Sequence, residues 1–447
     1  MLRSSVAGDR ERARGGQRSL SEGHDGLFDH TRLRQIVWCR ASASLGHPGA
    51  NVDVSELASI ALSHGTAYFN WKRRMNIPGS RRHGKPISLI RTTPPTPEWM
   101  GAALSRTLLE ISERGDVATL LRYHRFRGAD SDRQAGAAWL AKRFGAAPSI
   151  DRIIVTNGTQ SALLITLVNV VGSGNVLLTE SLSYYGLRQI ASFLNISVKG
   201  IAMDDDGAAP EAFEDACRKL SPKALFLTPT LHNPTTITMS HERRLALADV
   251  ARRYGVVIIE DDVYGLLPPE APPPISALAP DVTWYAAGLA KCLGPGLKIA
   301  YLLMPSAQAA TSAFDRFQTT STWHVTPLSA LVAQSWIADG TAEKVLLAVR
   351  NEAVARQEMA ARLFIHATYL TKPEALHMWL ALPRRWTQQS FVVAAAEAGV
   401  LVRSGSMFAV DEDSPPEAIR IVVGSPETRD SLGEALAALG PLVHENI

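Results

Sequence analysis

Between residues 150 and 305 the chain alternates short apolar runs with longer amphipathic segments, and this alternation restricts the fold more than any other feature. Each run is continuous and apolar, as expected of strands that are buried on both faces. The runs are Ile153–Thr156, Val176–Thr179, Ala224–Thr228, Val256–Ile259, Thr283–Ala286 and Ile299–Met304. One segment between them, 242–254, has the spacing of a helix with one apolar face, formed by Leu245, Ala248, Val250 and Ala251. The sequence therefore predicts an α/β fold with a mainly parallel central sheet covered by helices.

Charge and composition divide the 447 residues into regions. Residues 1–85 hold 14 basic and 7 acidic residues, whereas the remainder holds 32 basic and 36 acidic ones. A basic N-terminal piece on a mildly acidic body suggests a module that faces nucleic acid, or a disordered basic tail. From composition and breaker residues we expect a tail, an N-terminal module, a linker, a large domain and a small C-terminal α/β domain: 1–26, 27–76, 77–98, 99–325 and 326–447.

Two features bear on the compartment. The cysteines Cys39, Cys217 and Cys292 are scattered, which is typical of a reducing cytosol and leaves no pair at metal-ligand spacing. No apolar run reaches the roughly 18–20 residues of a membrane span. We therefore expect a cytoplasmic protein with no metal site and no membrane segment.

Polar groups follow three of the predicted strands, at the edge where ligands bind in such sheets. Gly158-Thr159-Gln160 opens a helix, and free backbone N–H groups there suit a phosphate. Asp261 and Tyr264 can point into one cleft. Lys291 lies among small and apolar residues, where burial would lower its pKa and make a neutral amine available for a Schiff base. Each signal is weak alone, because ordinary strand–helix turns and lysines at helix starts look similar.

The order of these pieces closely resembles the pyridoxal-phosphate aminotransferases of fold type I over about residues 86–440. The order is Gly158-Thr159-Gln160, then Tyr184, Asn233-Pro234-Thr235, Asp261-x-x-Tyr264, Lys291, Lys298 and Arg420. The runs 228–235, 260–265, 291–297 and 377–383 resemble one branch in particular, the MocR-type proteins. In that branch a GntR-like winged helix-turn-helix precedes an aminotransferase-like domain.

The resemblance implies a pyridoxal 5'-phosphate cofactor and a role for each residue. Lys291 would form an aldimine with the cofactor, Asp261 would hold the pyridine nitrogen protonated, and Tyr184 would stack on the ring. The remaining implied contacts are to the ring hydroxyl oxygen (Asn233, Tyr264), the phosphate (Gly158, Thr159, Gln160, Lys298), the phosphate of a neighbouring subunit (Tyr123) and a substrate carboxylate (Arg420). The contact from Tyr123 implies a homodimer.

Four positions depart from the family pattern. Gly288 and Ala290 stand where hydroxyl residues are usual, Lys298 replaces an arginine, and Thr236 replaces a glycine. These changes predict weaker cofactor binding than is typical, and they leave open a pocket that no longer binds the cofactor.

The N-terminal segment is similar to the GntR pattern, although the match is imperfect. Ser55-Glu-Leu-Ala58 would begin the helix before the recognition helix, and Ser63 would cap the recognition helix, but His64 replaces an arginine and the glycine-rich wing is absent. Lys72, Arg73 and Arg74 could contact phosphates. Either this degenerate module binds duplex DNA, or it is a remnant.

Two functions follow from the resemblance. The first is a transcriptional regulator that senses an amino acid or amine through aldimine formation at Lys291. The second is an aminotransferase that moves an amino group between an amino acid and a 2-oxo acid. A third class, a structural partner without the cofactor, is the least consistent with the retained residues, and the sequence leaves open whether the chain is an enzyme.

Overall fold

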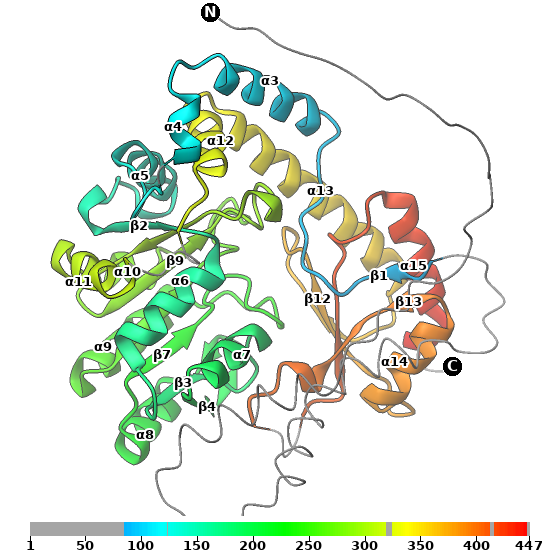
Figure 1. The fold of residues 1–447 in the computed structure, drawn as a ribbon. Coiled ribbons are helices and arrows are strands. Elements are labelled where there is room, and N and C mark those ends of the chain that lie inside the picture. The colour runs from blue at the N-terminus through cyan, green and yellow to red at the C-terminus, as the bar shows by residue number, and fades with distance from the viewer. Residues whose placement is uncertain (1–84, 123, 319–323, 412–414, 445–447) are drawn as a thin grey trace, which may run out of the picture. The chain divides into compact units, whose positions relative to one another are not determined.

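The computed structural model describes residues 85–122, 124–318, 324–411 and 415–444. The predicted tail and N-terminal module therefore lie outside the described residues. Within the described ranges, the chain builds a seven-stranded sheet and a four-stranded sheet, each with its own hydrophobic core (Figure 1).

The seven-stranded sheet has the order β2-β10-β9-β8-β7-β3-β4. All pairs from β4 to β9 are parallel, and β10 runs antiparallel to both of its neighbours. The strands are β2 (Ile153–Thr156), β3 (Val176–Glu180), β4 (Ser197–Ile201), β7 (Ala224–Leu227), β8 (Val257–Asp261), β9 (Thr283–Gly288) and β10 (Ala300–Leu303). The predicted mainly parallel sheet is confirmed, and all six predicted strands lie in it.

Alternation along the strands separates the two faces of this sheet. Val155 and Tyr301 pack with α5 and α12, and Leu225 packs with α8 and α9, whereas Ile154 and Phe226 point to the opposite face, toward α6, α7 and α11. The helices are α3 (Met100–Ser112), α4 (Val117–Arg122), α5 (Asp130–Phe144), α6 (Thr159–Thr166), α7 (Tyr185–Phe193), α8 (Pro210–Leu220), α9 (His241–Tyr254), α10 (Ile275–Leu278), α11 (Ala307–Phe317) and α12 (Pro327–Ala338).

Local sequence sets the ends of several of these helices. In α9 the Ser240 side chain accepts a hydrogen bond from the Arg243 nitrogen, and the helix ends at Gly255 with φ at 65°. The helix α5 ends in the same way at Gly145, with φ at 74°. Short single turns and one π-turn complete this part: Ile150–Arg152, Leu167–Val171 and Pro295–Leu297.

The four-stranded sheet has the order β11-β12-β15-β14 and carries the second core. Its strands are β11 (Tyr369–Leu370), β12 (Met378–Ala381), β14 (Arg403–Ser404) and β15 (Ala418–Ile421); α14 (Gln388–Glu397) and α15 (Arg429–Val443) pack against it. Smaller elements are β1 (Ile87–Ser88), β5 (Met203–Asp204), β6 (Gly207–Ala208), β13 (Val400–Leu401) and the turn Gly405–Met407.

The 23-residue helix α13 (Thr341–Leu363) connects the two cores, as Figure 1 shows. Its first half packs through Val345 and Val349 into the core of the seven-stranded sheet, and Ala360 packs into the second core. The helix α12 also belongs to the first core, through Trp336. The segment after residue 326 therefore begins with a helix, α12, that is buried against α5 and α3.

The described part of the predicted linker pairs with the body. The strand β1 pairs in parallel with β13, and Leu89 is fully buried in the second core. Ile87, Leu89 and Ile90 are the apolar residues of this segment. None of the helices in the described residues combines the length and apolar content that a membrane crossing requires.

Candidate functional site

A cavity of about 480 Å³ lies beyond the carboxyl ends of the parallel strands, between the two sheets. Every predicted site residue that the structure describes lines it: Gly158, Thr159, Gln160, Tyr184, Asn233, Asp261, Tyr264, Lys291, Lys298 and Arg420. The remaining one, Tyr123, lies outside the described residues. Residues that are far apart in sequence therefore meet at one site, as parallel-sheet topology predicts.

Two of the described lysines line this cavity. Lys291 is largely buried, whereas Lys298 is exposed. Lys291 follows β9, and its Nζ donates a hydrogen bond to the carbonyl of Thr92 at 2.5 Å. Burial, and then the charge of Arg420, lower the pKa of Lys291 to about 8, against the attraction of Asp261. A substantial fraction of the amine is then neutral near pH 7–8, which is the form that attacks a carbonyl carbon.

Asp261, the last residue of β8, presents a carboxylate with spare hydrogen-bonding capacity. Its Oδ1 is buried without a partner among the described residues. Burial, and next the charge of Asp262, raise the pKa of Asp261 to about 7, while Lys291 lowers it. An unpaired buried acceptor is costly, so this oxygen is suited to a ligand that brings an N–H group.

Arg420 enters the cavity from β15 of the four-stranded sheet and is 2% exposed. Its Nη1 donates to Asn233 Oδ1 and its Nη2 to the carbonyl of Ile90, both at 2.7 Å. The guanidinium also lies 4.7 Å from the centroid of the Phe408 ring. Each Nη atom keeps a second N–H, so the fork can still bind a carboxylate.

Two tyrosines border the same space. The Tyr184 hydroxyl accepts a hydrogen bond from Gln160 Nε2 at 3.1 Å. Tyr264 is buried, and burial raises its pKa, partly against the charge of Arg420 and a hydrogen bond with the Thr92 side chain. Both phenols are therefore neutral over the working pH range and can act as hydrogen-bond donors.

The turn before α6, for which the sequence predicts a phosphate contact, opens onto the cavity. Gly158 precedes the helix with φ at 80°, a conformation that favours glycine, and the amides of the first turn point out of the helix N-terminus. A Cβ built at Gly288 would overlap the Thr159 hydroxyl. The hydroxyl that is missing at position 288 is therefore replaced in space by that of Thr159.

One part of the cavity wall was not predicted from the sequence. Arg91, Thr92 and Thr93 line the cavity, and the carbonyls of Ile90 and Thr92 accept hydrogen bonds from Arg420 and Lys291. We call residues 89–93 the strap. The apolar residues Ile87, Leu89 and Ile90 are the sequence signal that this segment packs onto the body.

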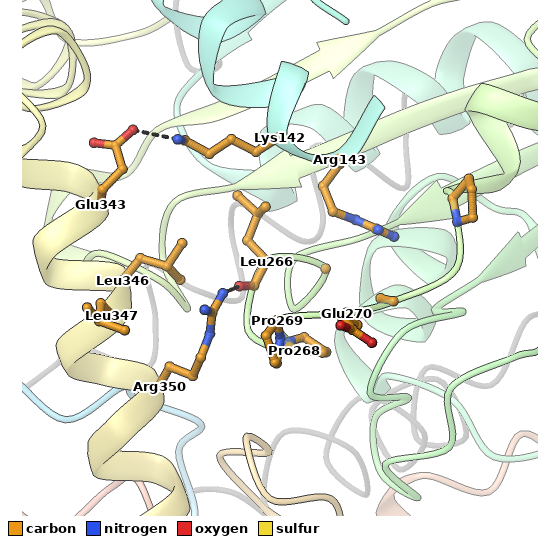
Figure 2. Close-up of a pocket in the computed structure, with 13 residues that line it drawn as sticks. Lys142, Arg143, Leu266, Pro268, Pro269, Glu270, Glu343, Leu346, Leu347 and Arg350 are labelled. Carbon is orange, nitrogen blue, oxygen red and sulfur yellow. Dashed lines mark hydrogen bonds and ion pairs between the residues drawn. The ribbon is translucent and has the colours of Figure 1, made fainter. Parts of the chain in front are cut away.

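A larger cavity of about 610 Å³ lies elsewhere, between α5, α13 and residues 265–273 (Figure 2). Figure 2 shows Lys142 paired with Glu343 at 2.7 Å, and Arg350 donating to the carbonyl of Leu266 at 2.9 Å. It contains none of the predicted site residues, and these charged groups are already paired. The smaller cavity, with its unpaired carboxylate oxygen and buried amine, is therefore the candidate site.

Solved structures share this fold. An archaeal alanine:glyoxylate aminotransferase matches with a TM-score of 0.74 and 25% identity, covering 81% of this chain and 91% of that one. A kynurenine aminotransferase of Pyrococcus horikoshii matches with a TM-score of 0.73 and 21% identity, covering 91% and 98%.

Curated relatives include regulators. The HTH-type transcriptional regulator YdeF of Bacillus subtilis is 31% identical over 309 residues, covering 69% of this chain and 66% of that one. The vitamin B6 salvage pathway transcriptional repressor PtsJ of Salmonella typhimurium is 28% identical, covering 67% and 69%. The match spans less than two thirds of YdeF, and 60% of a second Bacillus subtilis regulator, YisV.

The family model for aminotransferase class I and II matches residues 91–438, which include residues 91–93 of the strap, both sheets and every residue that lines the cavity. Members of this family depend in general on pyridoxal 5'-phosphate. With the fold, the site and the family model in agreement, the chain belongs to the class I and II aminotransferase family.

Proposed function

We propose that this chain is a transcriptional regulator that binds pyridoxal 5'-phosphate and senses an amino acid or amine at Lys291. The observation that carries the proposal is the meeting of Lys291, Asp261 and Arg420 around one cavity. A buried amine, a carboxylate with one unpaired oxygen and a guanidinium fork match three different parts of such a cofactor–ligand pair.

The residues present fit the cofactor. The orphan Oδ1 of Asp261 suits a protonated ring nitrogen, and the cradle around Gly158 suits a phosphate. A cavity of about 480 Å³ is within the range of small-molecule sites, roughly 300–1,000 Å³. When bound, this cofactor supplies an aldehyde that condenses with amines and a ring that accepts electrons.

The chain's own groups would then divide the work. Lys291 would bind the aldehyde carbon and, when released by an incoming amine, hold or move a proton with its Nζ. Asn233 and Tyr264 would donate hydrogen bonds to the ring oxygen, and Tyr184 would cover the ring face. Arg420, oriented by Asn233 Oδ1 and the Ile90 carbonyl, would grip a carboxylate.

Relatives and chain layout favour a regulator. Both YdeF and PtsJ are named as transcriptional regulators, and the N-terminal region of this chain carries a basic segment with GntR-like spacing. The strap follows that region in the sequence, and the carbonyls of Ile90 and Thr92 contact cavity residues. A ligand that binds two strap arrangements with different affinity would shift the equilibrium between them.

An aminotransferase is the second candidate. It shares the three groups that carry the regulator proposal, and the observation that favours turnover in particular is the lowered pKa of the Lys291 amine, because transamination needs proton transfer whereas a sensor could function without it. The two functions share the site and differ in turnover.

One experiment separates them. Purified protein with cofactor is mixed with a panel of amino acids, and absorbance, 2-oxo acid release and binding to the duplex upstream of its own gene are measured together. A regulator binds that duplex with an affinity that falls steeply with salt, and the triple variant Lys72→Ala, Arg73→Ala, Arg74→Ala flattens the salt slope without changing the cofactor band. If the protein instead converts an amino acid and a 2-oxo acid, and binds that duplex no better than random DNA, it is an aminotransferase and the regulator proposal is wrong.

We also propose a homodimer, because the position of Tyr123 in sequence places it where the family completes the phosphate site of the neighbouring subunit. Light scattering should give twice the 48.4 kDa chain mass when cofactor is present. A mass of one chain would contradict this assembly.

A further inference from the structure

His377 is a fully buried histidine that the proposed function does not use. It lies directly before β12 of the four-stranded sheet and is 0% exposed. Its Nε2 lies 3.2 Å from the carbonyl oxygen of His232, in the segment that follows β7 of the seven-stranded sheet. Because a carbonyl oxygen can only accept, Nε2 carries the hydrogen and donates it. This hydrogen bond therefore links the two sheets at the residue before Asn233, which lines the ligand cavity.

The segment around Asn233, residues 231–237, has a strained backbone, and we call it the Asn233 turn. Leu231 has φ at 48° and Thr236 has φ at 64°, both in the left-handed region that favours glycine. A glycine is usual at position 236 in the proteins that this chain resembles, and the left-handed backbone there gives the physical reason. Such conformations cost free energy and persist only where the surroundings hold them.

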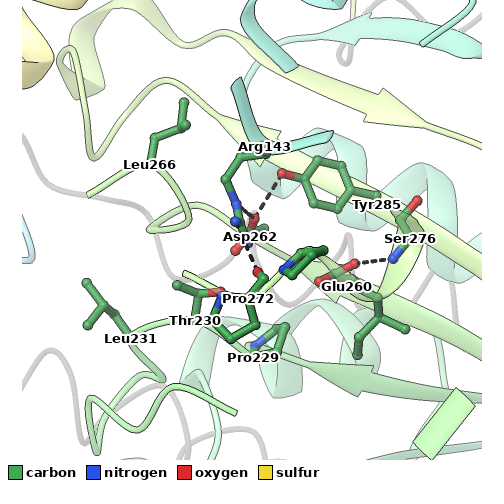
Figure 3. Close-up of polar contacts among 12 residues, drawn as sticks. Arg143, Pro229, Thr230, Leu231, Glu260, Asp262, Leu266, Pro272, Ser276 and Tyr285 are labelled. Atoms are coloured by element: carbon green, nitrogen blue, oxygen red, sulfur yellow. Dashed lines mark hydrogen bonds and ion pairs between the residues drawn. The ribbon is translucent and has the colours of Figure 1, made fainter. Parts of the chain in front are cut away.

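The turn is held from both sheets. Arg244 of α9 donates to the carbonyl of Pro229 at 2.9 Å and to the Thr230 hydroxyl at 3.0 Å, just before the turn. Figure 3 shows Pro229 and Thr230 together with Leu231, the first residue of the turn. From the side of the four-stranded sheet, the hydrogen bond from His377 holds the strained backbone itself.

The ring of His377 also packs against Tyr264, which follows β8 and lines the cavity. The two ring centroids are 5.6 Å apart, and Tyr264 is 2% exposed. His377 is held in turn through its own carbonyl oxygen, which accepts from Gln357 Nε2 of α13 and from the Thr371 hydroxyl, both at 3.1 Å. A fixed side chain therefore contacts one cavity residue directly and the backbone beside another.

We propose that His377 is a positioning residue for the contact between this chain and the ring hydroxyl oxygen of the cofactor. Its N–H holds the Asn233 turn against the backbone strain, and its ring fixes the place of Tyr264. Because Asn233 Oδ1 accepts from Arg420 Nη1, the amide nitrogen of Asn233 is left as the donor of that side chain. The proposal rests on the proposed function, since it requires Asn233 and Tyr264 to face the ring oxygen.

The test compares variants of His377 that keep or lose the Nε2 donor, in the full chain. His377→Asn and His377→Phe lose the donor, so cofactor affinity should fall about tenfold, which corresponds to the loss of a hydrogen bond. His377→Gln places an amide N–H close to the position of Nε2 and should bind the cofactor several-fold more tightly than His377→Asn, although both lack the ring. Equilibrium dialysis of the cofactor measures these affinities, and circular dichroism checks the fold. Equal affinities of the Asn and Gln variants would mean that the hydrogen bond does not position the site, which overturns the proposal.

A double-mutant cycle shows whether His377 acts through the two donors. The background Asn233→Ala, Tyr264→Phe lacks both groups that would donate to the ring oxygen. In that background, His377→Asn should weaken cofactor binding by less than about twofold, because the groups through which it acts are gone. An undiminished loss of affinity there would mean that His377 acts by another route, and the proposal would be wrong.

Matched controls and a second variant keep the outcome readable. His241 is exposed at the start of α9, so His241→Asn and His241→Phe should leave cofactor affinity unchanged. If the His377 variants do not fold, Gln357→Leu removes a donor to the His377 carbonyl and keeps the imidazole; it must weaken cofactor binding in the wild type and not in the double-variant background, or the proposal fails. A wild type that forms no cofactor band overturns the proposed function, whereas a normal band with the same affinity in all His377 variants overturns only this inference.

Discussion

The floor of the ligand cavity and the strap across it are specified by different kinds of sequence information. The floor consists of groups at or just after the ends of buried strands, such as Asp261 at the end of β8 and Lys291 after β9. The strap contacts the same cavity through backbone carbonyls, and it is anchored by the short pairing of β1, which precedes it, with β13, far away in sequence. The position of the floor residues can be predicted from the local sequence pattern, whereas the position of the strap depends on a pairing between distant parts of the chain.

The largest expected effect is on the floor. Lys291→Ala removes the one buried amine of the cavity, so covalent attachment of the cofactor should be lost completely. Borohydride reduction followed by mass spectrometry measures it, and the fold should be retained by circular dichroism because Lys291 contributes one hydrogen bond, to Thr92. The exposed Lys298→Ala serves as control and should keep the attachment. Attachment that persists in Lys291→Ala would place the reactive amine elsewhere.

The sequence predicted the floor because strand burial and turn chemistry are local. The six apolar runs are strands in the structure, and cavity residues follow the parallel ones at one edge of the sheet. The edge strand β4 was missed, because Ser197 and Lys199 are not apolar and the run lacks the pattern of a strand buried on both faces.

The strap and the domain boundary could not be predicted in the same way. Nothing near residue 89 indicates Leu401 as the acceptor of its N–H group, since the pairing depends on where α14 and β13 lie after folding. The start of the second core depends likewise on α13, whose first half belongs to one core and whose end belongs to the other. The spatial replacement of a hydroxyl at Gly288 by that of Thr159 also needed coordinates.

A second prediction concerns Glu180, at the end of β3, and tests whether this buried carboxyl group is protonated in the folded protein. Both of its carboxylate oxygens are buried without a hydrogen-bond partner among the described residues, and His232 Nε2 lies 3.7 Å away. Burial raises the pKa of Glu180 to about 8, although backbone N–H groups lower it. Because the pKa of Glu180 is higher in the folded state than in the unfolded state, its contribution to the free energy of unfolding is full below the unfolded-state pKa. That contribution is lost as the pH rises through about 8.

Glu180→Gln should therefore gain stability relative to the wild type as the pH rises from 5 to 8. The gain per pH unit approaches about 1.4 kcal/mol where the two states differ by one bound proton, so a difference of several kcal/mol is expected in the free energy of unfolding. Urea unfolding at both pH values measures it, and Glu98→Gln, at an exposed glutamate, is the control. Parallel curves for wild type and Glu180→Gln would mean that Glu180 is ionised throughout.

A third prediction concerns the strap. Leu89→Ala removes a fully buried side chain, a change that typically costs about 2–5 kcal/mol, and the strap should loosen. Arg420 and Lys291 would then lose carbonyl partners, so affinity for the amino compound should fall about tenfold while the cofactor band stays. Titration of the spectral change measures it. Leu109→Ala, at a leucine that is 63% exposed, should have no effect. If Leu89→Ala leaves the affinity for the amino compound unchanged, the strap does not contribute to binding.

The smallest expected effect returns to the floor, at Lys298. This residue lines the cavity with an exposed side chain and holds φ at 50°, so it presents a point charge from a left-handed turn where the resemblance implies an arginine. Lys298→Arg restores a planar fork that can bind a phosphate with two hydrogen bonds, and cofactor affinity should rise roughly threefold. Lys298→Gln removes the charge and should lower affinity by a similar factor. Equilibrium dialysis of the cofactor resolves both changes at low salt, where exposed charges act most strongly. If neither variant changes the affinity, the phosphate is held by the turn at Gly158 alone. Lys298 is then not part of the cofactor site, and fewer floor residues bind the cofactor than the resemblance implies.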